Sequence, residues 1–329
     1  MERAIFGTRA GEILVGYGPF RASTEPPTGG VAFYKNDFSL SVEKPWLTPE
    51  RVETMNRVPR GISAPAPLTW TEPDPQGFSD VFREVSEAIT RGVIEKSVPV
   101  VTEKGRGDCR PDDLFAKLFD LPKSLRPYGW LGEDEGFLGA TPEVLFRYFD
   151  GRIYTMALAG TARSDERMLF AVDEKEIREH EFVAQTLISK LSDLGMVIRR
   201  ERDILDLGKL IHFQTLIKVE LYQYETIRTL IERLHPTPAL GSLPRTAGTL
   251  EQLQDWRNRL GCPPTFGAPF GLWRDGDFEA LVAIRMLAWQ ADDFLLPSGC
   301  GIIQESRLVN EWRELALKRG SVKNLFFGE

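Results

Sequence analysis

The chain has 329 residues, of which 42% are hydrophobic and 27% are charged, and its formal net charge is −7. These values are ordinary for a globular protein, and the negative charge argues against a nucleic-acid-binding surface. Three scattered cysteines without a C-x-x-C pair favour a reducing compartment and no disulfide framework. The chain starts without the apolar run of a signal peptide and contains no stretch of about 18 apolar residues. We therefore expect a cytoplasmic protein without a membrane segment.

Residues 1–77 are strand-like and rich in turn formers, and they end in a proline-studded stretch from Pro59 to Pro75. This stretch is the one plausible boundary between two parts of the chain. We divide the sequence there into an N-terminal portion, residues 1–77, and a main body, residues 78–329, and expect them to form one compact unit. Apolar residues at helical spacing predict a helix from Phe78 to Val93, and a short strand is expected at Val98–Val101.

Two Asp-Gly pairs mark tight hairpins, because these residues tolerate the positive φ angles of such turns. Asp150-Gly151 separates the expected strands 137–149 and 152–158, and Asp275-Gly276 separates 270–273 from 278–289. Repeated hairpins indicate antiparallel sheet. Apolar stripes predict helices between these sheet regions, at 177–194 and 227–234. The predicted fold class is α+β, with large antiparallel β-sheets in a sandwich and helices packed on the outer faces.

Four glutamates form two pairs with the same spacing, Glu176 with Glu179 and Glu311 with Glu314. Positions i and i+3 are neighbours on a helix surface, so each pair places two carboxylates on one stripe. Two facing stripes would form a cage of oxygen donors that suits Mg²⁺. An isolated pair is weak evidence, since most such pairs among 48 acidic residues are solvated. The glycine-spaced loop 298–301 precedes the second pair and could bring backbone N–H groups close to an anion.

Three charged residues stand in apolar surroundings. Most lysines are solvated, but desolvation of Lys96 at a sheet edge would favour its neutral, basic form. Burial would raise the pKa of Glu143 and suit it to act as an acid, unless it is a strand-edge carboxylate facing water. Arg285 lies within a nearly apolar strand and must find an anion, either a protein carboxylate or a ligand.

Two further residues have simple structural interpretations. His180 falls near the centre of the apolar stripe of its helix, which is typical of a core histidine with a satisfied hydrogen bond. Lys318 follows Glu314 by four residues, so the two can form a helix-stabilising pair. Beside the glycine loop, the same ammonium could hold a substrate carboxylate. In the C-terminal helix, we expect a packing side that consists of Leu308, Trp312, Leu315 and Ala316.

Together these segments resemble the chorismate-utilising enzymes, which include isochorismate, salicylate, anthranilate and aminodeoxychorismate synthases. The matches follow the family's order over about residues 78–329, the expected chorismate-binding catalytic domain, whereas the first 77 residues carry no recognisable motif. The matching segments are Phe137–Glu143, Leu158–Thr161, Lys175–His180, Ile211–Thr215, Leu234–Gly241, Phe270–Gly271, Ala283–Arg285, Gly299–Ile303 and Glu311–Lys318.

Three positions are most similar to the isochorismate synthases within this family. Members that add water resemble this chain in having a lysine at Lys96, where aminating members usually have glutamine. The aminodeoxychorismate group has a nucleophilic lysine at the position of Ala159. Aminating and salicylate-forming members commonly have threonine at the position of Ala239.

The resemblance implies a Mg²⁺-dependent conversion of chorismate to isochorismate, by water addition at C2 with loss of the C4 hydroxyl. Lys96 would deprotonate the water and Glu143 would protonate the departing hydroxyl. Glu179 and Glu314 would hold Mg²⁺ directly, and Glu176 and Glu311 mainly through water. The implied substrate-binding residues are Gly160, Thr161, His212, Ala239, Phe266, Arg285, Gly299, Gly301 and Lys318.

Phe266 departs from the resemblance, because the family commonly has a tyrosine there. Loss of one hydrogen bond to a charged group would weaken binding by about 1.5–3 kcal/mol. The alternatives are a salicylate synthase that also eliminates pyruvate, an aminating enzyme with a glutaminase partner, and a non-catalytic chorismate-binding protein. We expect no glutaminase subunit and a monomer or weak homodimer, with the product used for menaquinone, a siderophore or salicylate.

Overall fold

The computed structural model describes residues 2–58 and 63–328. Residues 59–62, in the predicted proline-rich boundary, lie outside this part.

The described strands are β1 Arg3–Gly7, β2 Ile13–Ser23, β3 Val31–Lys35, β4 Trp46–Met55, β5 Thr69–Thr71, β6 Val100–Arg106, β7 Arg126–Leu131, β8 Glu135–Thr141, β9 Val144–Phe149, β10 Arg152–Arg163, β11 Gly195–Arg199, β12 Asp203–Asp206, β13 Leu210–Leu221, β14 Pro269–Arg274, β15 Asp277–Val282, β16 Met286–Gln290 and β17 Asp293–Gly299. The helices are α1 Pro75–Thr90, α2 Pro111–Ala116, α3 Arg167–Phe170, α4 Glu174–Leu191, α5 Ile227–Leu234, α6 Ala247–Arg259 and α7 Leu308–Phe327, with short 3₁₀ turns at Lys117–Phe119 and Ser164–Glu166.

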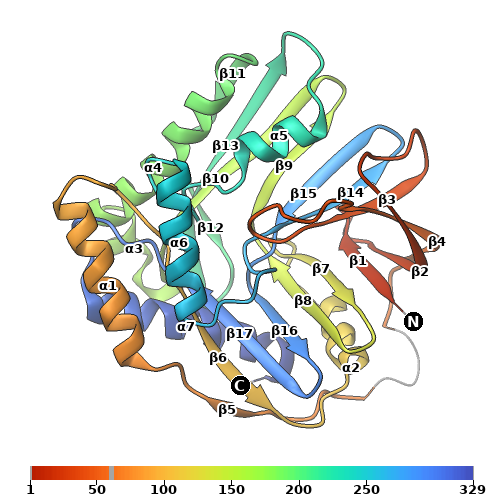
Figure 1. Ribbon diagram of the computed structural model, residues 1–329, viewed down its shortest axis with the longest axis horizontal. Helices are drawn as coiled ribbons and strands as arrows, with labels where there is room; N and C mark the ends of the chain where they lie inside the picture. Colours follow the sequence, from red (N-terminus) through yellow and green to blue (C-terminus); the bar gives the residue numbers. More distant parts are fainter. Residues whose placement is uncertain (1, 59–62, 329) are drawn as a thin grey trace.

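All strand pairs are antiparallel, as predicted. Neighbouring strands follow the order β5–β6–β17–β16–β8–β7–β1–β2–β4–β3–β14–β15–β9–β10–β13, and β11 and β12 share the remaining edge of β13. The strands form two groups, one around β17 and one around β10, and β1–β4 connect them (Figure 1). The strands of residues 1–77 are thus interleaved with those of the main body.

Both predicted Asp-Gly hairpins are confirmed. Asp150 and Gly151 have φ angles of 50° and 67° between β9 and β10, and Asp275 and Gly276 have 50° and 101° between β14 and β15. The prediction of one strand over 278–289 is wrong. It is broken into β15 and β16 at Arg285, whose φ is 53°.

Most of the helices lie on one side of the molecule, whereas α2 lies apart from them (Figure 1). α4 packs on β10 and β13, and α7 packs on β17. The expected packing side of α7 is correct at Leu315, which is buried, and wrong at Ala316, which is exposed. The buried face of α7 instead continues through two charged residues, Glu311 and Arg319. An apolar face interrupted by charge is typical of a helix that lines a functional site.

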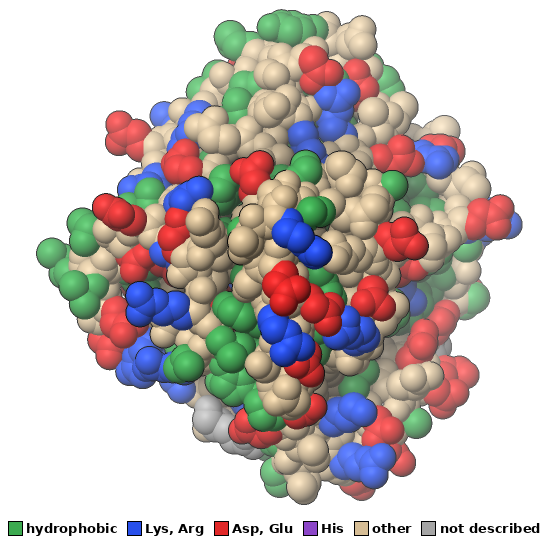
Figure 2. Space-filling model, turned by 60° about the vertical axis from the view of Figure 1, so that its left-hand side comes forward, with side chains coloured by type: hydrophobic (Ala, Val, Ile, Leu, Met, Phe, Trp, Pro, Cys, Tyr) green, Lys and Arg blue, Asp and Glu red, His purple; other side chains and the backbone are tan. Residues whose placement is uncertain are grey.

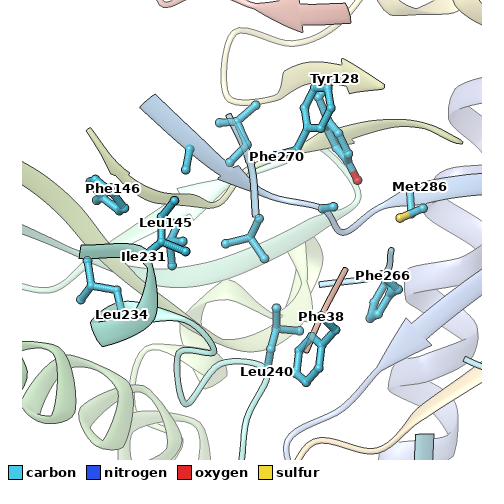
Figure 3. Close-up of a cluster of buried hydrophobic side chains, with 14 of the residues drawn as sticks. Phe38, Tyr128, Leu145, Phe146, Ile231, Leu234, Leu240, Phe266, Phe270 and Met286 are labelled. Atoms are coloured by element: carbon cyan, nitrogen blue, oxygen red, sulfur yellow. The ribbon is translucent and has the colours of Figure 1, made fainter. Parts of the chain in front are cut away.

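One large apolar core joins the strand groups to the helices. In Figure 3, Phe266 lies beside Phe38 and Leu240 at one end of a cluster that also includes Tyr128 and Phe270. Basic and acidic side chains are interspersed on the face shown in Figure 2. The three cysteines are free. No helix among the described residues is both long and apolar enough to cross a membrane.

Candidate active site

A cavity opens between the two strand groups and α7, and it collects most of the predicted site residues. Its walls come from β10, β13, the end of β17, α7 and the turn at Arg285. Eleven of the fifteen predicted site residues line it, namely Glu143, Gly160, Thr161, Glu179, His212, Ala239, Phe266, Arg285, Gly299, Gly301 and Lys318. The other four, Lys96, Glu176, Glu311 and Glu314, do not line it.

A bulge in β10 shapes one wall of the cavity. The register between β10 and β13 shifts between Ala159 and Thr161, and Gly160 has a φ of 76° that disfavours other residues. The bulge turns the Thr161 N–H toward Glu176 Oε2, at 2.8 Å. It also places the Gly160 carbonyl 2.7 Å from His212 Nδ1. One irregular residue thus connects the cavity wall to both α4 and β13.

His212 is held as a neutral imidazole with a defined tautomer. Its Nδ1–H donates to the Gly160 carbonyl, so its Nε2 accepts from the Arg285 guanidinium at 2.9 Å. Burial, reinforced by the charge of Arg285, keeps the pKa of His212 well below its usual range. His212 therefore orients the arginine without adding a positive charge to the cavity.

Arg285 occupies a strained backbone position. A non-glycine φ of 53° costs about 1–3 kcal/mol, and such residues cluster at functional sites. The Arg285 carbonyl accepts from the Ala140 N–H at 3.1 Å, and the buried Tyr128 hydroxyl donates to the preceding Ile284 carbonyl at 2.8 Å. The structure therefore fixes the turn on both sides.

The guanidinium of Arg285 donates to Ser321 Oγ at 2.6 Å and to His212, and within residues 2–58 and 63–328 it forms no ion pair. Burial lowers its pKa to about 10, so it remains charged at neutral pH. A buried cation of this kind needs an anion. The predicted anion was either a protein carboxylate or a ligand. Because no carboxylate of the described residues pairs with Arg285, we expect its anion to be a ligand.

Glu143 is a buried carboxyl with one side-chain hydrogen bond. It lies between β8 and β9, is 3% exposed, and Oε1 accepts from Thr237 Oγ1 at 3.5 Å. Burial raises its pKa to about 7, although Thr237 and the charges of Lys96 and Lys318 oppose the shift. The alternative of a water-facing carboxylate is wrong, and the predicted burial is present.

Lys96 lies behind the cavity wall. It is 0% exposed, its backbone bridges Leu243, and its Nζ donates to Glu179 Oε1 at 2.9 Å. Gly301, which lines the cavity, leaves room for this ion pair, because a Cβ there would overlap the Glu179 carboxylate and contact Lys96 Cε at 2.9 Å. The predicted desolvation is correct. The ion pair with Glu179 was not predicted.

The two glutamate pairs of α4 and α7 face the same region, as the spacing predicted. Lys175 Nζ lies among them, 2.8 Å from Glu176 Oε1 and 3.3 Å from both Glu179 Oε2 and Glu311 Oε1. Glu314 pairs instead with Lys318 at 2.6 Å, and the same ammonium donates to the Gly299 carbonyl at 2.8 Å. The predicted helix-stabilising pair of Glu314 and Lys318 is therefore present, and it lies beside the glycine loop.

The pKa values of these carboxyls reflect crowding of negative charge. Burial and the neighbouring charge of Glu314 raise the pKa of Glu311. Burial also raises that of Glu176, and Glu179 adds to the effect although Lys175 opposes it. For Glu179, the nearby ammonium groups of Lys96 and Lys175 outweigh burial and hold the pKa below its usual range.

The donor set fits a hard divalent cation. Carboxylate oxygens are the ligands that Mg²⁺ prefers, and Glu311 Oε2 is buried without a hydrogen-bond partner among the described residues. In the arrangement that the structure shows, no three acidic, histidine or cysteine side chains in the described part of the chain converge closely enough to hold a metal.

His180 is a core residue. It is fully buried on α4, and its Nε2 lies 2.8 Å from Thr215 Oγ1. Burial lowers its pKa to about 4, so it is neutral. The predicted burial in the core is confirmed, and the hydrogen bond is satisfied at Nε2, whereas Nδ1 is buried without a side-chain or backbone partner among the described residues.

Comparison with known proteins identifies the family of this chain. The family model described as "Chorismate binding enzyme" matches residues 35–325. The chain belongs to this family. The match includes the end of β3 and all of β4, in the N-terminal portion where the sequence showed no motif.

Among curated relatives of this chorismate-binding enzyme, the isochorismate synthase MenF of Bacillus subtilis is 30% identical, with an alignment that covers 100% of this chain and 77% of the relative. The salicylate biosynthesis isochorismate synthase of Pseudomonas aeruginosa is 32% identical over 57% of this chain and 41% of its own length. EntC of Escherichia coli is 31% identical over 57% and 50%. The matched region thus spans about half or less of these last two relatives.

The solved structure of the menaquinone-specific isochorismate synthase MenF from Escherichia coli shares the fold. Its TM-score is 0.84 at 18% identity, and the alignment covers 99% of this chain and 89% of that structure. The predicted α+β fold with large antiparallel sheets and packed helices is confirmed.

Four residues of this chorismate-binding enzyme contribute to the site but were not predicted, although Lys175 and Thr237 belong to segments quoted for the resemblance. Lys175 carries a visible signal, because it precedes Glu176 and lies four residues before Glu179, on the same helix face. Thr237, Tyr128 and Ser321 gain their roles only from tertiary contacts with Glu143, Ile284 and Arg285.

Proposed function

We propose that this chorismate-binding enzyme is a Mg²⁺-dependent isochorismate synthase. The observation that carries the proposal is the cavity that brings a buried acid, Glu143, together with the cations Arg285 and Lys318. A fully buried lysine, Lys96, lies immediately behind Gly301. A proton donor, a candidate base and two cations match a dianionic substrate whose reaction exchanges one hydroxyl for another.

The positions of the cations give the expected orientation of chorismate. Arg285, oriented by the neutral His212, takes the enolpyruvyl carboxylate. Lys318 and the glycine loop at Gly299 hold the ring carboxylate. Glu179 and Glu314 would hold Mg²⁺ directly, and Glu176 and Glu311 would contribute mainly through water. When bound, the metal neutralises and orients the ring carboxylate.

The chemical step needs one base and one acid. Lys96, as the free amine, takes a proton from a water molecule whose oxygen forms the new bond to C2. The ring double bonds shift, the C4–O bond breaks, and Glu143 gives its proton to the departing hydroxyl, which leaves as water. One water enters and one leaves, so the product is an isomer of the substrate.

We predict that purified protein with chorismate and Mg²⁺ releases isochorismate, in reversible equilibrium with chorismate. Ala159 and Ala239 both line the cavity, and their small side chains leave room for an ordered water. Chromatographic product analysis checks this. Stoichiometric pyruvate and salicylate would assign a salicylate synthase, anthranilate formed with ammonia would assign an aminating enzyme, and unchanged chorismate would assign a binding protein.

We also predict that kcat/KM falls as pH rises through about 7, because the proposed acid is active only while protonated and the pKa of Glu143 is raised to about 7. The carboxyl is protonated below this pH and ionised above it. A pH–rate profile measures the effect. The residual activity of Glu143→Gln, which cannot ionise, should lack this limb, and an unchanged limb would assign it to another group.

A cytoplasmic location, a monomer or weak homodimer, and activity without a glutaminase subunit remain predictions. Size-exclusion chromatography with light scattering tests the assembly state. Use of the product for menaquinone, a siderophore or salicylate also remains a prediction; the printed names of two relatives mention salicylate and menaquinone.

A further inference from the structure

Lys175 is the most unusual charged residue near the cavity. Its ammonium lies 2.8–3.3 Å from carboxylate oxygens of Glu176, Glu179 and Glu311, which come from two different helices. The side chain is only 18% exposed. A lysine that is merely solvated on a helix surface would contact one carboxylate at most.

This ammonium lies where the carboxylate donors of α4 and α7 converge. Glu179 is shared between Lys175 and Lys96. Glu311 places one oxygen 3.3 Å from Lys175, and its other oxygen, Oε2, is buried without a partner in the described part of the chain. One monovalent cation therefore satisfies the carboxylates only in part. A divalent cation would satisfy them more fully, but it cannot occupy the same space as the ammonium.

We propose that Lys175 is an internal counter-ion that holds the glutamate pairs together in the metal-free enzyme and must withdraw when Mg²⁺ binds. This rests on the proposed function, because it concerns the metal of that same site. Lys175 competes directly with the metal for the carboxylates. The apparent affinity for Mg²⁺ therefore depends on how much more favourably the carboxylates interact with the metal than with the Lys175 ammonium. A like charge a few ångströms from the metal is strongly repelled, so the two are mutually exclusive.

A second consequence concerns the packing of α4 against α7. Without any cation, several buried carboxylates would repel one another across the two helices. Lys175 connects Glu176 and Glu179 on α4 to Glu311 on α7 and offsets that repulsion. The lysine thus keeps the empty site assembled while lowering its affinity for the metal.

The test is isothermal titration calorimetry of Mg²⁺ into the full-length, metal-free protein, without substrate. We expect Lys175→Met to bind Mg²⁺ at least about tenfold more tightly than the wild type, because the competing charge is gone. Lys175→Arg keeps the charge and should remain within about threefold of the wild type or bind more weakly. Arg178→Met is the matched control, since it removes one positive charge from the same helix at a residue that pairs with the exposed Glu305, and it should leave the affinity unchanged.

Thermal unfolding in EDTA gives an independent readout. Lys175→Met should melt at a lower temperature than the wild type, and added Mg²⁺ should raise its melting temperature by more. If Lys175→Met does not fold, Lys175→Gln gives the same comparison. Equal or weaker Mg²⁺ binding by the folded neutral variant would overturn the role of Lys175 alone. Failure of the wild type to bind Mg²⁺ at all would overturn the proposed metal site and this inference with it.

Discussion

Replacing Lys96 with alanine should lower kcat by a factor of at least about 10², the range expected for loss of a general base. Lys96 is fully buried behind Gly301, and its only side-chain hydrogen bond in the described part of the chain goes to Glu179. A lysine removed from water at this position has no solubilising role. Steady-state turnover of chorismate, followed by product chromatography, measures the loss.

The Lys96→Ala variant needs a control because it also removes a counter-ion from the buried Glu179 carboxylate, which is destabilising in itself. Lys96→Arg separates the two effects, because a guanidinium keeps the positive charge but cannot be deprotonated in a protein. We expect Lys96→Arg to retain most of the thermal stability and still lose about 10² in kcat. Turnover by Lys96→Ala within threefold of the wild type would show that the base lies elsewhere.

Glu143→Gln should cost a similar factor of at least about 10² in kcat, since the amide keeps the shape of the carboxyl but has no acidic proton to give. Its neighbour Thr237 can still hydrogen-bond to the amide, so the fold should persist. Near-normal kcat in Glu143→Gln would exclude it as the acid.

The fold was predictable where local backbone chemistry decides the structure. Asp150-Gly151 and Asp275-Gly276 specify tight turns by themselves, and each fixes the register of one hairpin. The strand break at Arg285 was not predictable in this way. Its positive φ is imposed by distant groups, the Tyr128 hydroxyl and the Ala140 N–H, which hold the backbone on either side. The hydrophobic pattern of 282–287 reads as one continuous strand.

In the candidate site, too, local sequence spacing was predictive, whereas long-range contacts could not be predicted. The i, i+3 spacing of Glu176 and Glu179 correctly predicted which carboxylates share a helix face. It could not show that Lys96 would reach Glu179 across 83 residues of sequence. The Gly160 bulge was also hidden, because it appears only when the register of β10 against β13 is known. Most of the residues that the structure brings together at the cavity were thus predictable, whereas their mutual contacts depended on long-range packing.

Removal of divalent metal with excess EDTA should abolish turnover, and Glu179→Gln and Glu314→Gln should each do the same in the presence of Mg²⁺. The amide is close in size to the carboxylate but carries no charge, so it is a much weaker ligand for Mg²⁺. Glu179 lines the cavity, and Glu314, which does not, forms an ion pair with the Lys318 that lines it. The dianionic substrate would then face the remaining carboxylates without the metal's two positive charges.

The readouts must separate loss of metal from loss of fold, because Glu179 also pairs with Lys96 and Lys175. Circular dichroism and thermal unfolding test the fold, and calorimetric titration with Mg²⁺ tests the metal site directly. Glu181→Gln is the matched control, since it lies two residues further along α4 and pairs with Arg199 at the surface. It should bind Mg²⁺ and turn over like the wild type. Undiminished turnover in excess EDTA would remove the metal hypothesis, and normal Mg²⁺ binding by an inactive Glu179→Gln would instead make Glu179 a residue that positions Lys96.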